Sequence, residues 1–460
     1  MGGGVKESSF NSKKIVLSLA TISFLASYAN ASTSTSSDAC SPTTSTSSRS
    51  SGSGSTTYNC TINSLHNSGI TLSDSGTSTL TITKEGAIQP NGGGFAILLV
   101  GENGNNTPTL ELINQGTINN IGIVGTRGFT GTITVKTFDN EGTISYIGIG
   151  GSRGFTGTIT VKTFDNKNKG TIDGEIYMST MNGGTISIEN FTNEGTITSK
   201  DEKYPAVYFE GNNVHIKTFK NTGFISGSGD KLEHGNFSVA GGVSMSGGTI
   251  DNFINEGTIT SNTEESQHNP AGVKLNYATV KTFENTGLIS GLNGFLTTKG
   301  TIETFKNSGT IASTSTGNGE AAIKIQTVNG NFSTITHFIN EGTIKSDSNG
   351  VLIESGDKIG TLTNQGTIET KLNGISFFDS GPEGSPGEAD LGKIVLESGS
   401  SIKAQKNGIN IDNKAVRTLR ADGIEVKAGA SVSGGEAGIY LAKGKEITAP
   451  ITVSGTVSGG

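Results

Sequence analysis

The sequence predicts an all-β fold, a right-handed parallel β-helix (solenoid) with three short strands per rung. Two observations carry this prediction: one short unit recurs from about residue 60 onward, and only 32% of the residues are apolar, with 69 glycines and no tryptophan. A compact globular domain has about 45–50% apolar residues. A stack of small repeats needs fewer, because successive units share one column of core side chains.

The clearest repeat is a near-perfect duplication. The segment 121–140 recurs at 147–166, 26 residues later. The two copies differ only where Gly150 replaces the equivalent of Val124 and Ser152 that of Thr126. A repeat period of this length matches one turn of a parallel β-helix, and it is shorter than the roughly 40–50 residues of a β-propeller blade. Leucine-rich repeats have a different leucine spacing, so they are also disfavoured.

A shorter motif, Asn-x-Gly-x-Ile, occurs ten times at intervals of 22–34 residues. It begins at Asn114, Asn140, Asn168, Asn193, Asn221, Asn255, Asn285, Asn307, Asn340 and Asn364. Two residues earlier there is nearly always a large apolar residue: Phe138, Phe191, Phe219, Phe253, Phe283, Phe305, Phe338, Leu112 or Leu362. We expect the glycine to supply a positive φ at a corner and the asparagine to tolerate left-handed backbone there. Stacked asparagines and phenylalanines should form ladders along the molecule.

A third strand completes each unit. Short apolar segments follow the motif at 271–277, 321–327, 349–355 and 373–379. Each unit therefore contains three strands separated by turns, and its apolar faces can be buried only by stacking on its neighbours.

The chain divides into four segments. We predict a signal peptide at 1–31, a Ser/Thr-rich flexible leader at 32–59, a β-helix with the Asn-x-Gly-x-Ile repeats at 60–380, and a continuing β-helix with variant rungs at 381–460 that is truncated before any C-terminal barrel. The signal has a positive flank, a short apolar stretch and the small-residue site Ala29-Asn30-Ala31. Cys40 and Cys60, the only cysteines, are expected to form a local disulfide in an exported chain.

The net charge bears on which classes of binding partner the chain can have. The net charge is −7, and residues 1–31 carry three lysines and one glutamate, so the remainder has a net charge of −9. An acidic chain without a basic stripe disfavours nucleic acid and anionic lipid as partners.

We predict no catalytic, cofactor-binding or metal-binding residues, and hence no enzyme. Residues 150–154 match the Gly-x-Ser-x-Gly motif of hydrolases, but no helical pattern follows them, so we interpret them as a turn of the repeat. The histidines lack the spacing of metal ligands, and the glutamates inside the corner motif are interpreted as solvated turn residues. These residues are His66, His215, His234, His268 and His337, and Glu141, Glu194, Glu256 and Glu341.

The Ala29-Asn30-Ala31 signal, the ladder of motifs from 114 to 368 and the variant rungs near the end together resemble the passenger regions of Gram-negative autotransporters (type V secretion). The resemblance covers nearly all of residues 60–460 and is greatest to the repetitive, vacuolating-cytotoxin-like group. It implies export through the inner membrane and a location at the cell surface, in the outer membrane or outside the cell. It also implies an outer-membrane translocator barrel, which this chain lacks.

We therefore expect a non-enzymatic passenger involved in adhesion and virulence, with a host-cell or bacterial surface receptor as its partner. Long polar inserts at 200–213, 226–242 and 261–272 are the predicted contact loops. Tyr204, Tyr208 and Phe209 are their predicted anchors. Two alternatives stay open: a toxin-like passenger that acts on host membranes, and a two-partner secreted β-helix exoprotein.

Overall fold

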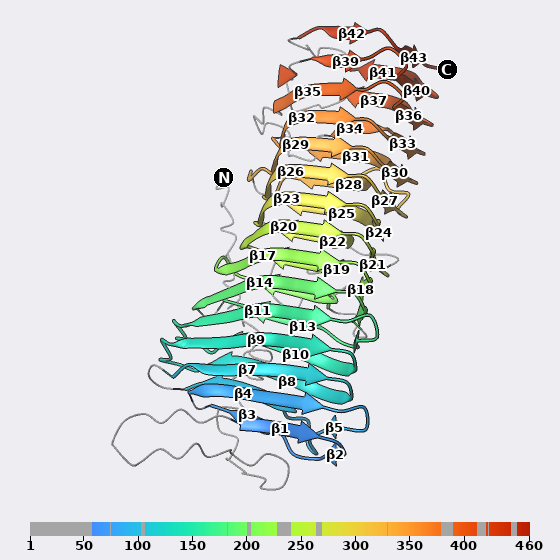
Figure 1. Cartoon of the computed structure of the whole chain (residues 1–460). Coiled ribbons are helices and arrows are strands. Elements are labelled where there is room, and N and C mark those ends of the chain that lie inside the picture. The colour runs from blue at the N-terminus through green and yellow to red at the C-terminus, as the bar shows by residue number, and fades with distance from the viewer. Residues whose placement is uncertain are drawn as a thin grey trace, which may run out of the picture.

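The computed structural model describes residues 58–460 except 74, 103–105, 182, 200–203, 228–240, 264–268, 329, 355, 379–389, 412–419, 422 and 443–448. Every secondary-structure element in this part of the chain is a β-strand, and all named strands pair in parallel with the next coil (Figure 1). No helix that could cross a membrane occurs in the described residues. The predicted signal peptide and residues 32–57 of the predicted leader lie outside them.

The coils contribute strands to three faces, with β8 and β10 each continuing from the second face onto the third, which confirms the predicted parallel β-helix. Face 1 is a 16-stranded sheet. Its strands are β1 (Tyr58–Ile62), β4 (Gly76–Ile82), β7 (Pro108–Asn114), β9 (Thr132–Asn140), β11 (Thr158–Asn166), β14 (Thr185–Asn193), β17 (Val214–Asn221), β20 (Thr249–Asn255), β23 (Thr279–Asn285), β26 (Thr301–Asn307), β29 (Thr334–Asn340), β32 (Lys358–Asn364), β35 (Asp390–Leu396), β38 (Arg420–Ala421), β39 (Ile424–Val426) and β42 (Ile451–Val453).

Face 2 follows the Asn-x-Gly corner. Its strands are β2 (Leu65–His66), β5 (Ala87–Ile88), β8 (Thr117–Gly125), β10 (Thr143–Gly151), β12 (Thr171–Ile172), β15 (Thr196–Thr198), β18 (Phe224–Gly227), β21 (Thr258–Ser261), β24 (Leu288–Gly291), β27 (Thr310–Ser313), β30 (Thr343–Ser346), β33 (Thr367–Thr370), β36 (Ser401–Ala404), β40 (Ser431–Gly434) and β43 (Thr456–Ser458).

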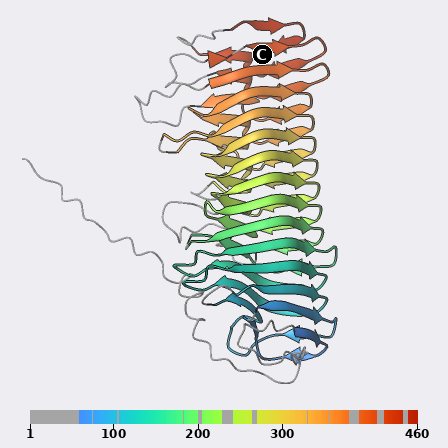
Figure 2. The ribbon, with the colours of Figure 1, turned by 60° about the vertical axis from the view of Figure 1, so that its left-hand side comes forward.

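Face 3 leads back to face 1 of the next coil. It contains the second halves of β8 and β10, together with β3 (Ile70–Leu72), β6 (Ile97–Gly101), β13 (Ile176–Ser179), β16 (Val207–Glu210), β19 (Gly241–Ser246), β22 (Ala271–Asn276), β25 (Asn293–Thr298), β28 (Ala321–Gln326), β31 (Asn349–Glu354), β34 (Ile375–Phe378), β37 (Asn407–Ile411) and β41 (Ala437–Leu441). Strands of successive coils lie one above another along the whole stack (Figure 2).

One continuous apolar core fills the space between the faces. Its most regular part is the predicted phenylalanine ladder on face 1. The rings from Phe138 to Phe338 stack with centroids 4.5–5.0 Å apart, one ring per coil, and all are buried. Leu112 and Leu362 occupy the same column at its two ends and are also buried. The low apolar share of the sequence is therefore sufficient, because each ring is shared by the coils above and below it.

A buried asparagine ladder runs beside the rings, as the sequence predicts. In each step the side-chain amide of one asparagine donates to the side-chain oxygen of the next, at 2.7–2.8 Å, from Asn114 to Asn364. One predicted member is wrong. Asn166 occupies the ladder in place of Asn168, which is exposed in a two-residue insertion after the strand. The ladder asparagine is the residue two positions after the buried phenylalanine. Phe164 aligns with Phe138 and Phe191 in the neighbouring strands, and this register aligns Asn166 with Asn140 and Asn193.

The predicted role of the corner glycine is also wrong. The glycines of the Asn-x-Gly corners do not have positive φ, and neither do their asparagines. A Cβ on Gly257 would instead overlap the carbonyl oxygen of Gly223 in the preceding coil, and the same clash recurs at Gly287 and Gly342. Glycine is needed here because the corners of successive coils approach too closely for any side chain.

The β-helix continues beyond residue 390 with a different corner. Leu396 and then Val426 replace asparagine at the ladder position, so the amide ladder ends at Asn364. The following corners contain Gly399 and Gly429, both with φ of 84°. Positive φ therefore belongs to the variant corners. At the other end of the stack, Cys60 is buried in β1 and is disulfide-bonded. Cys40, the only other cysteine, lies outside the described residues.

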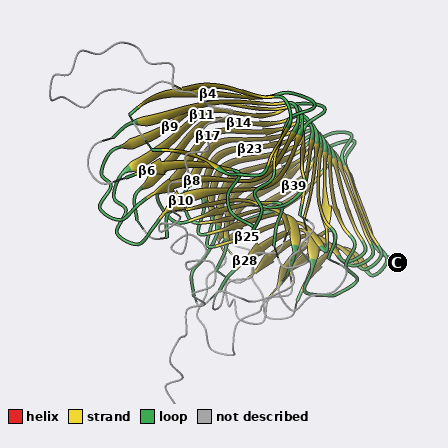
Figure 3. Cartoon of the chain, turned by 90° about the horizontal axis from the view of Figure 1, so that it is seen from below, coloured by secondary structure: helices red, strands yellow, loops and turns green. Residues whose placement is uncertain are grey.

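The connections at two of the three corners vary in length, and Figure 3 shows the strands of successive coils in projection along the stack. Residues 199–206, 262–270 and 314–320 join face 2 to face 3, and residues 327–333 join face 3 to face 1. The corner between faces 1 and 2 stays short: one residue separates the ladder asparagine from the corner glycine in the repeats, except after Asn166, where an insertion lengthens the corner and the amide ladder continues.

Candidate functional site

Buried polar side chains gather on the outer side of face 3. On faces 1 and 2 the outward residues are mostly half-exposed or exposed, whereas β22, β25 and β31 are buried on both sides. We call the outward residues of successive face 3 strands the outer column. It comprises Tyr177, Tyr208, Ser244, Lys274, Leu296, Lys324, Leu352 and Ser376. A covered column that contains charges and phenols is the first candidate for a functional site.

Two charged residues of this column, Lys274 and Lys324, lie beside two carboxylates, Glu320 and Glu354. Lys324 is 4% exposed, and its ammonium lies 3.5 Å from Glu320 and 3.9 Å from Glu354. Lys274, also 4% exposed, donates to the main-chain oxygen of Asn269 at 3.3 Å. Burial, with the positive charge of Lys324 as a second cause, lowers the pKa of Lys274 to about 7. The cluster is electrically balanced when all four groups are charged.

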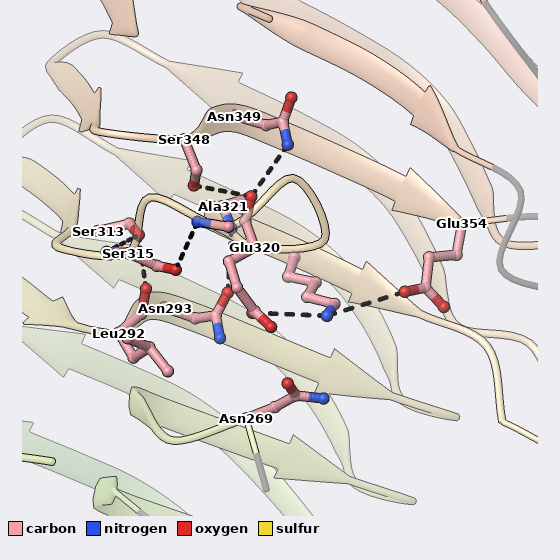
Figure 4. A network of polar contacts seen from close by, with 12 residues as sticks. Asn269, Leu292, Asn293, Ser313, Ser315, Glu320, Ala321, Ser348, Asn349 and Glu354 are labelled. Atoms are coloured by element: carbon pink, nitrogen blue, oxygen red, sulfur yellow. Dashed lines mark hydrogen bonds and ion pairs between the residues drawn. The ribbon is translucent and has the colours of Figure 1, made fainter. Parts of the chain in front are cut away.

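A framework of serines and asparagines fixes the loop that carries Glu320 (Figure 4). Ser348 donates to the main-chain oxygen of Glu320 at 2.8 Å, and Asn349 donates to the same oxygen at 3.1 Å. Asn293 accepts from the main-chain nitrogen of Ala321 at 3.0 Å. The loop is thus fastened to the coils on both sides of it, which places the Glu320 carboxylate beside Lys324.

A buried carboxyl lies one turn further along. Asp357 is 1% exposed and accepts from the main-chain nitrogen of Ser333 at 2.7 Å, while its second oxygen has no hydrogen-bond partner. Burial raises the pKa of Asp357 to about 8, so the group is largely protonated at neutral pH. A protonated carboxyl here joins the corner after β31 to the corner before β29.

At the other end of the outer column, phenols replace the amines. The rings of Tyr177 and Tyr208 stack with centroids 5.5 Å apart. Tyr177 donates to the carboxylate of Glu210, which also accepts from Ser179 at 3.1 Å. Burial, followed by the charge of Glu210, raises the pKa of both phenols well above the usual range. These phenols stay neutral, so they act as hydrogen-bond donors and as packing surfaces.

Two of the predicted contact anchors are corrected by these positions. Phe209 is fully buried in the core and packs edge-on against Phe191 and Phe219. Tyr208 is only 7% exposed in the outer column, and Tyr204 is half-buried. The sequence pattern failed because β16 lies within the predicted insert 200–213 and supplies a regular strand. Residues 200–203, 228–240 and 264–268 of the three predicted inserts lie outside the described residues.

The other sequence motifs lie in turns or on the surface. The Gly-x-Ser-x-Gly segment ends β10 and forms a turn in which the Phe155 nitrogen donates to the Ser152 oxygen at 2.9 Å. His215 lies 3.2 Å from Asp251 on face 1, and His337 is exposed. The four corner glutamates are exposed. His234 and His268 lie outside the described residues, and the described part contains no group of three His, Cys, Asp or Glu that could hold a metal.

Sequence reasoning missed the buried charges, although a signal was present. Lys274 and Lys324 interrupt the apolar segments 271–277 and 321–327 at the outward position. The pattern places them outward, where a lysine is ordinarily solvated. Only the three-dimensional arrangement shows that this side of face 3 is covered. Lys274 and Lys324 are each 4% exposed, and Lys324 lies 3.9 Å from Glu354 of the next coil, so the cluster joins coils.

The geometry defines a polar-faced parallel β-helix with a covered, ion-paired outer column. Comparisons with known proteins add no relative: no family model, no curated protein and no solved structure matches this chain.

Proposed function

We propose that the chain is a non-enzymatic, surface-displayed autotransporter passenger that adheres to a receptor on host cells or on other bacteria. The observation that carries the proposal is that one corner of each coil is nearly constant in length while the two others are variable. The Asn-x-Gly corner stays short along the ladder, whereas the connections at the two other corners vary in length. A rigid stack that presents variable loops suits recognition, since binding residues are concentrated on loops held by a rigid scaffold.

Adhesion is favoured over action on membranes by charge and polarity. The chain has a net charge of −7, and a helix that inserts into a membrane surface needs an apolar face and basic residues. The outward positions of faces 1 and 2 instead carry mainly threonine, serine, lysine and glutamate.

The test displays residues 32–460 on a non-adherent Gram-negative host by fusion to a heterologous translocator barrel. We expect the displaying cells to adhere to cultured host cells or to aggregate, and the isolated passenger not to release dye from lipid vesicles. A chain displaying only residues 32–57 is the control for the stack. Correctly displayed passenger that promotes neither adherence nor aggregation would refute the proposal, and dye release would favour the toxin-like alternative.

A further inference from the structure

At the corner between faces 3 and 1, two successive coils have a non-glycine residue with left-handed backbone. The first residue after the face 3 strand has left-handed backbone in four consecutive coils: Gly211, Gly247, Tyr277 and Lys299, with φ of 104°, 84°, 53° and 54°. The nitrogens of the first three donate to the equivalent carbonyl of the next coil at 2.7–2.9 Å, so the positions are equivalent. Glycine satisfies this geometry without strain, whereas tyrosine and lysine do not.

The two strained residues interact with each other on the surface. Tyr277 is 40% exposed, and the ammonium of Lys299 lies 4.5 Å from the centroid of its ring. The same ammonium donates to the Tyr277 hydroxyl at 2.5 Å. An exposed cation–π contact contributes little to folding. Strained residues at positions where glycine would serve without strain point to a role in binding.

A second exposed ring extends this row. Phe332 is 45% exposed, and its ring covers Gly356 so closely that a Cβ there would overlap it. Ser333, the next residue, lies in the coil that follows Lys299, because the Thr334 nitrogen donates to the Gly300 oxygen at 2.8 Å. Tyr277, Lys299 and Phe332 therefore occupy three successive coils along one corner. With about 4.8 Å between coils, the backbones of Tyr277 and Phe332 are two coil spacings apart, and the Phe332 ring extends toward Gly356 in the following coil.

Positive charge exceeds negative charge around this row. Lys281 and Lys358 are exposed on the adjoining part of face 1 and join Lys299. The acidic groups there that reach the surface are Asp251 and Glu303, whereas Asp357, beside Lys358, is buried. Asp251 is paired with Lys281 at 2.7 Å. In a chain with a net charge of −7, a local excess of lysine favours an anionic ligand.

We propose that the row of Tyr277, Lys299 and Phe332 binds an acidic oligosaccharide. Aromatic rings offer flat apolar surfaces to the faces of sugar rings, and the lysine pairs with a carboxylate or sulfate between them. A peptide fits less well, because the backbone on both sides of this corner is already paired between coils and offers no edge for an added strand. This inference rests on the proposed adhesive function and names its ligand class.

The test measures binding of the full exported chain to oligogalacturonate, hyaluronan oligomers and heparin fragments by calorimetry. We expect at least one to bind, and its methyl-esterified or desulfated form to bind more weakly. Tyr277→Gly and Lys299→Gly should each weaken binding by about tenfold or more, as for central interface residues. The same variants should keep or raise the unfolding midpoint, because glycine removes left-handed strain.

Phe224→Ala is the matched control, because Phe224 is 39% exposed on face 2, away from this corner. It should leave affinity unchanged. The proposal is overturned if none of the three acidic probes binds, if both glycine variants bind normally, or if polyglutamate binds with equal affinity through the same residues. A lower midpoint in both glycine variants would instead assign the two side chains to folding. Adherence that persists in a variant without oligosaccharide binding would leave the adhesive function standing and refute this site alone.

Discussion

At the scale of single residues, burial decides the chemistry of the outer column. A lysine and an aspartate have pKa values near neutrality because both are nearly excluded from solvent, and burial disfavours the charged form of each. The two pKa shifts have opposite signs. Lys274 is lowered to about 7 from an ordinary value of 10.5, whereas Asp357 is raised to about 8 from 3.8. The two groups therefore contribute opposite dependences of stability on pH.

The sign of each contribution follows from proton uptake on folding. Folding releases a proton from Lys274 between pH 7 and 10.5, so its contribution to stability rises with pH across that range and is constant below it. Folding takes up a proton at Asp357 between pH 3.8 and 8, so its contribution falls as pH rises through that range. The sum has a minimum between about pH 7 and 8.

We expect this minimum in the stability of the coils around β22 to β32, measured by hydrogen exchange as a function of pH. Lys274→Met should remove the rise above pH 7 and leave the fall below it. Asp357→Asn should remove the fall and leave the rise. Identical pH profiles for the wild type and both variants would show that neither group titrates in the folded chain as its burial implies.

At the scale of the element, the corner after face 1 owes its sequence to contacts between coils. Asn255 serves the amide ladder, with bonds of 2.7 and 2.8 Å to Asn285 and Asn221, and Gly257 leaves room for the carbonyl of Gly223. Neither role could operate in an isolated unit. The residues of the motif are therefore required by contacts between stacked coils, although asparagine and glycine are also common in ordinary turns.

Gly257→Ala tests this explanation. The added methyl group would force two coils apart, and we expect a loss of about 1–3 kcal/mol or more in the free energy of unfolding, as for other overpacked sites. Gly319→Ala is the control: its Cβ meets open space and its φ is not positive, so a change within about 0.5 kcal/mol is expected. Denaturant unfolding followed by circular dichroism measures both. If both substitutions change the free energy of unfolding by the same small amount, the close contact between coils does not explain the corner glycine, and local backbone conformation would.

At the scale of the whole molecule, each coil contacts mainly its two neighbours. The ring of Phe253 stacks between Phe219 and Phe283, at 4.8 and 4.7 Å. Stability in such a stack is approximately a sum of coil and interface contributions. A destabilising substitution in one coil should therefore affect that coil and its immediate neighbours, and leave distant coils unchanged.

Phe253→Ala should destabilise by about 3–5 kcal/mol, as other buried Phe truncations do. We expect hydrogen exchange to quicken in β17, β20 and β23 and to stay unchanged in β4 and β7. Equal quickening at all coils would indicate a single cooperative unit and contradict nearest-neighbour stacking. An effect within about 0.5 kcal/mol would show that the ring is not in the core.

The repeat pattern alone predicts the architecture. Repetition of Phe-x-Asn and Gly-x-Ile was enough to predict three strands per coil, the inward phenylalanine column and the amide ladder, because each inward position recurs in every coil and its chemistry is repeated. The single error in the ladder, Asn168 for Asn166, arose where an insertion duplicated the motif and only the register of Phe164 could choose between the two asparagines.

The environment of residues outside the core follows from the fold and not from the repeat pattern. Strand periodicity assigns Lys274 to the outer side, but it does not show that this side is covered, which is what shifts its pKa. In the same way Phe209 looked like an exposed anchor until β16 placed it in the core. Tyr277 and Lys299 lie 22 residues apart and become neighbours only because consecutive coils stack. Outward residues of face 3 change from coil to coil, so contacts among them depend on register and loop paths that a one-dimensional pattern does not contain.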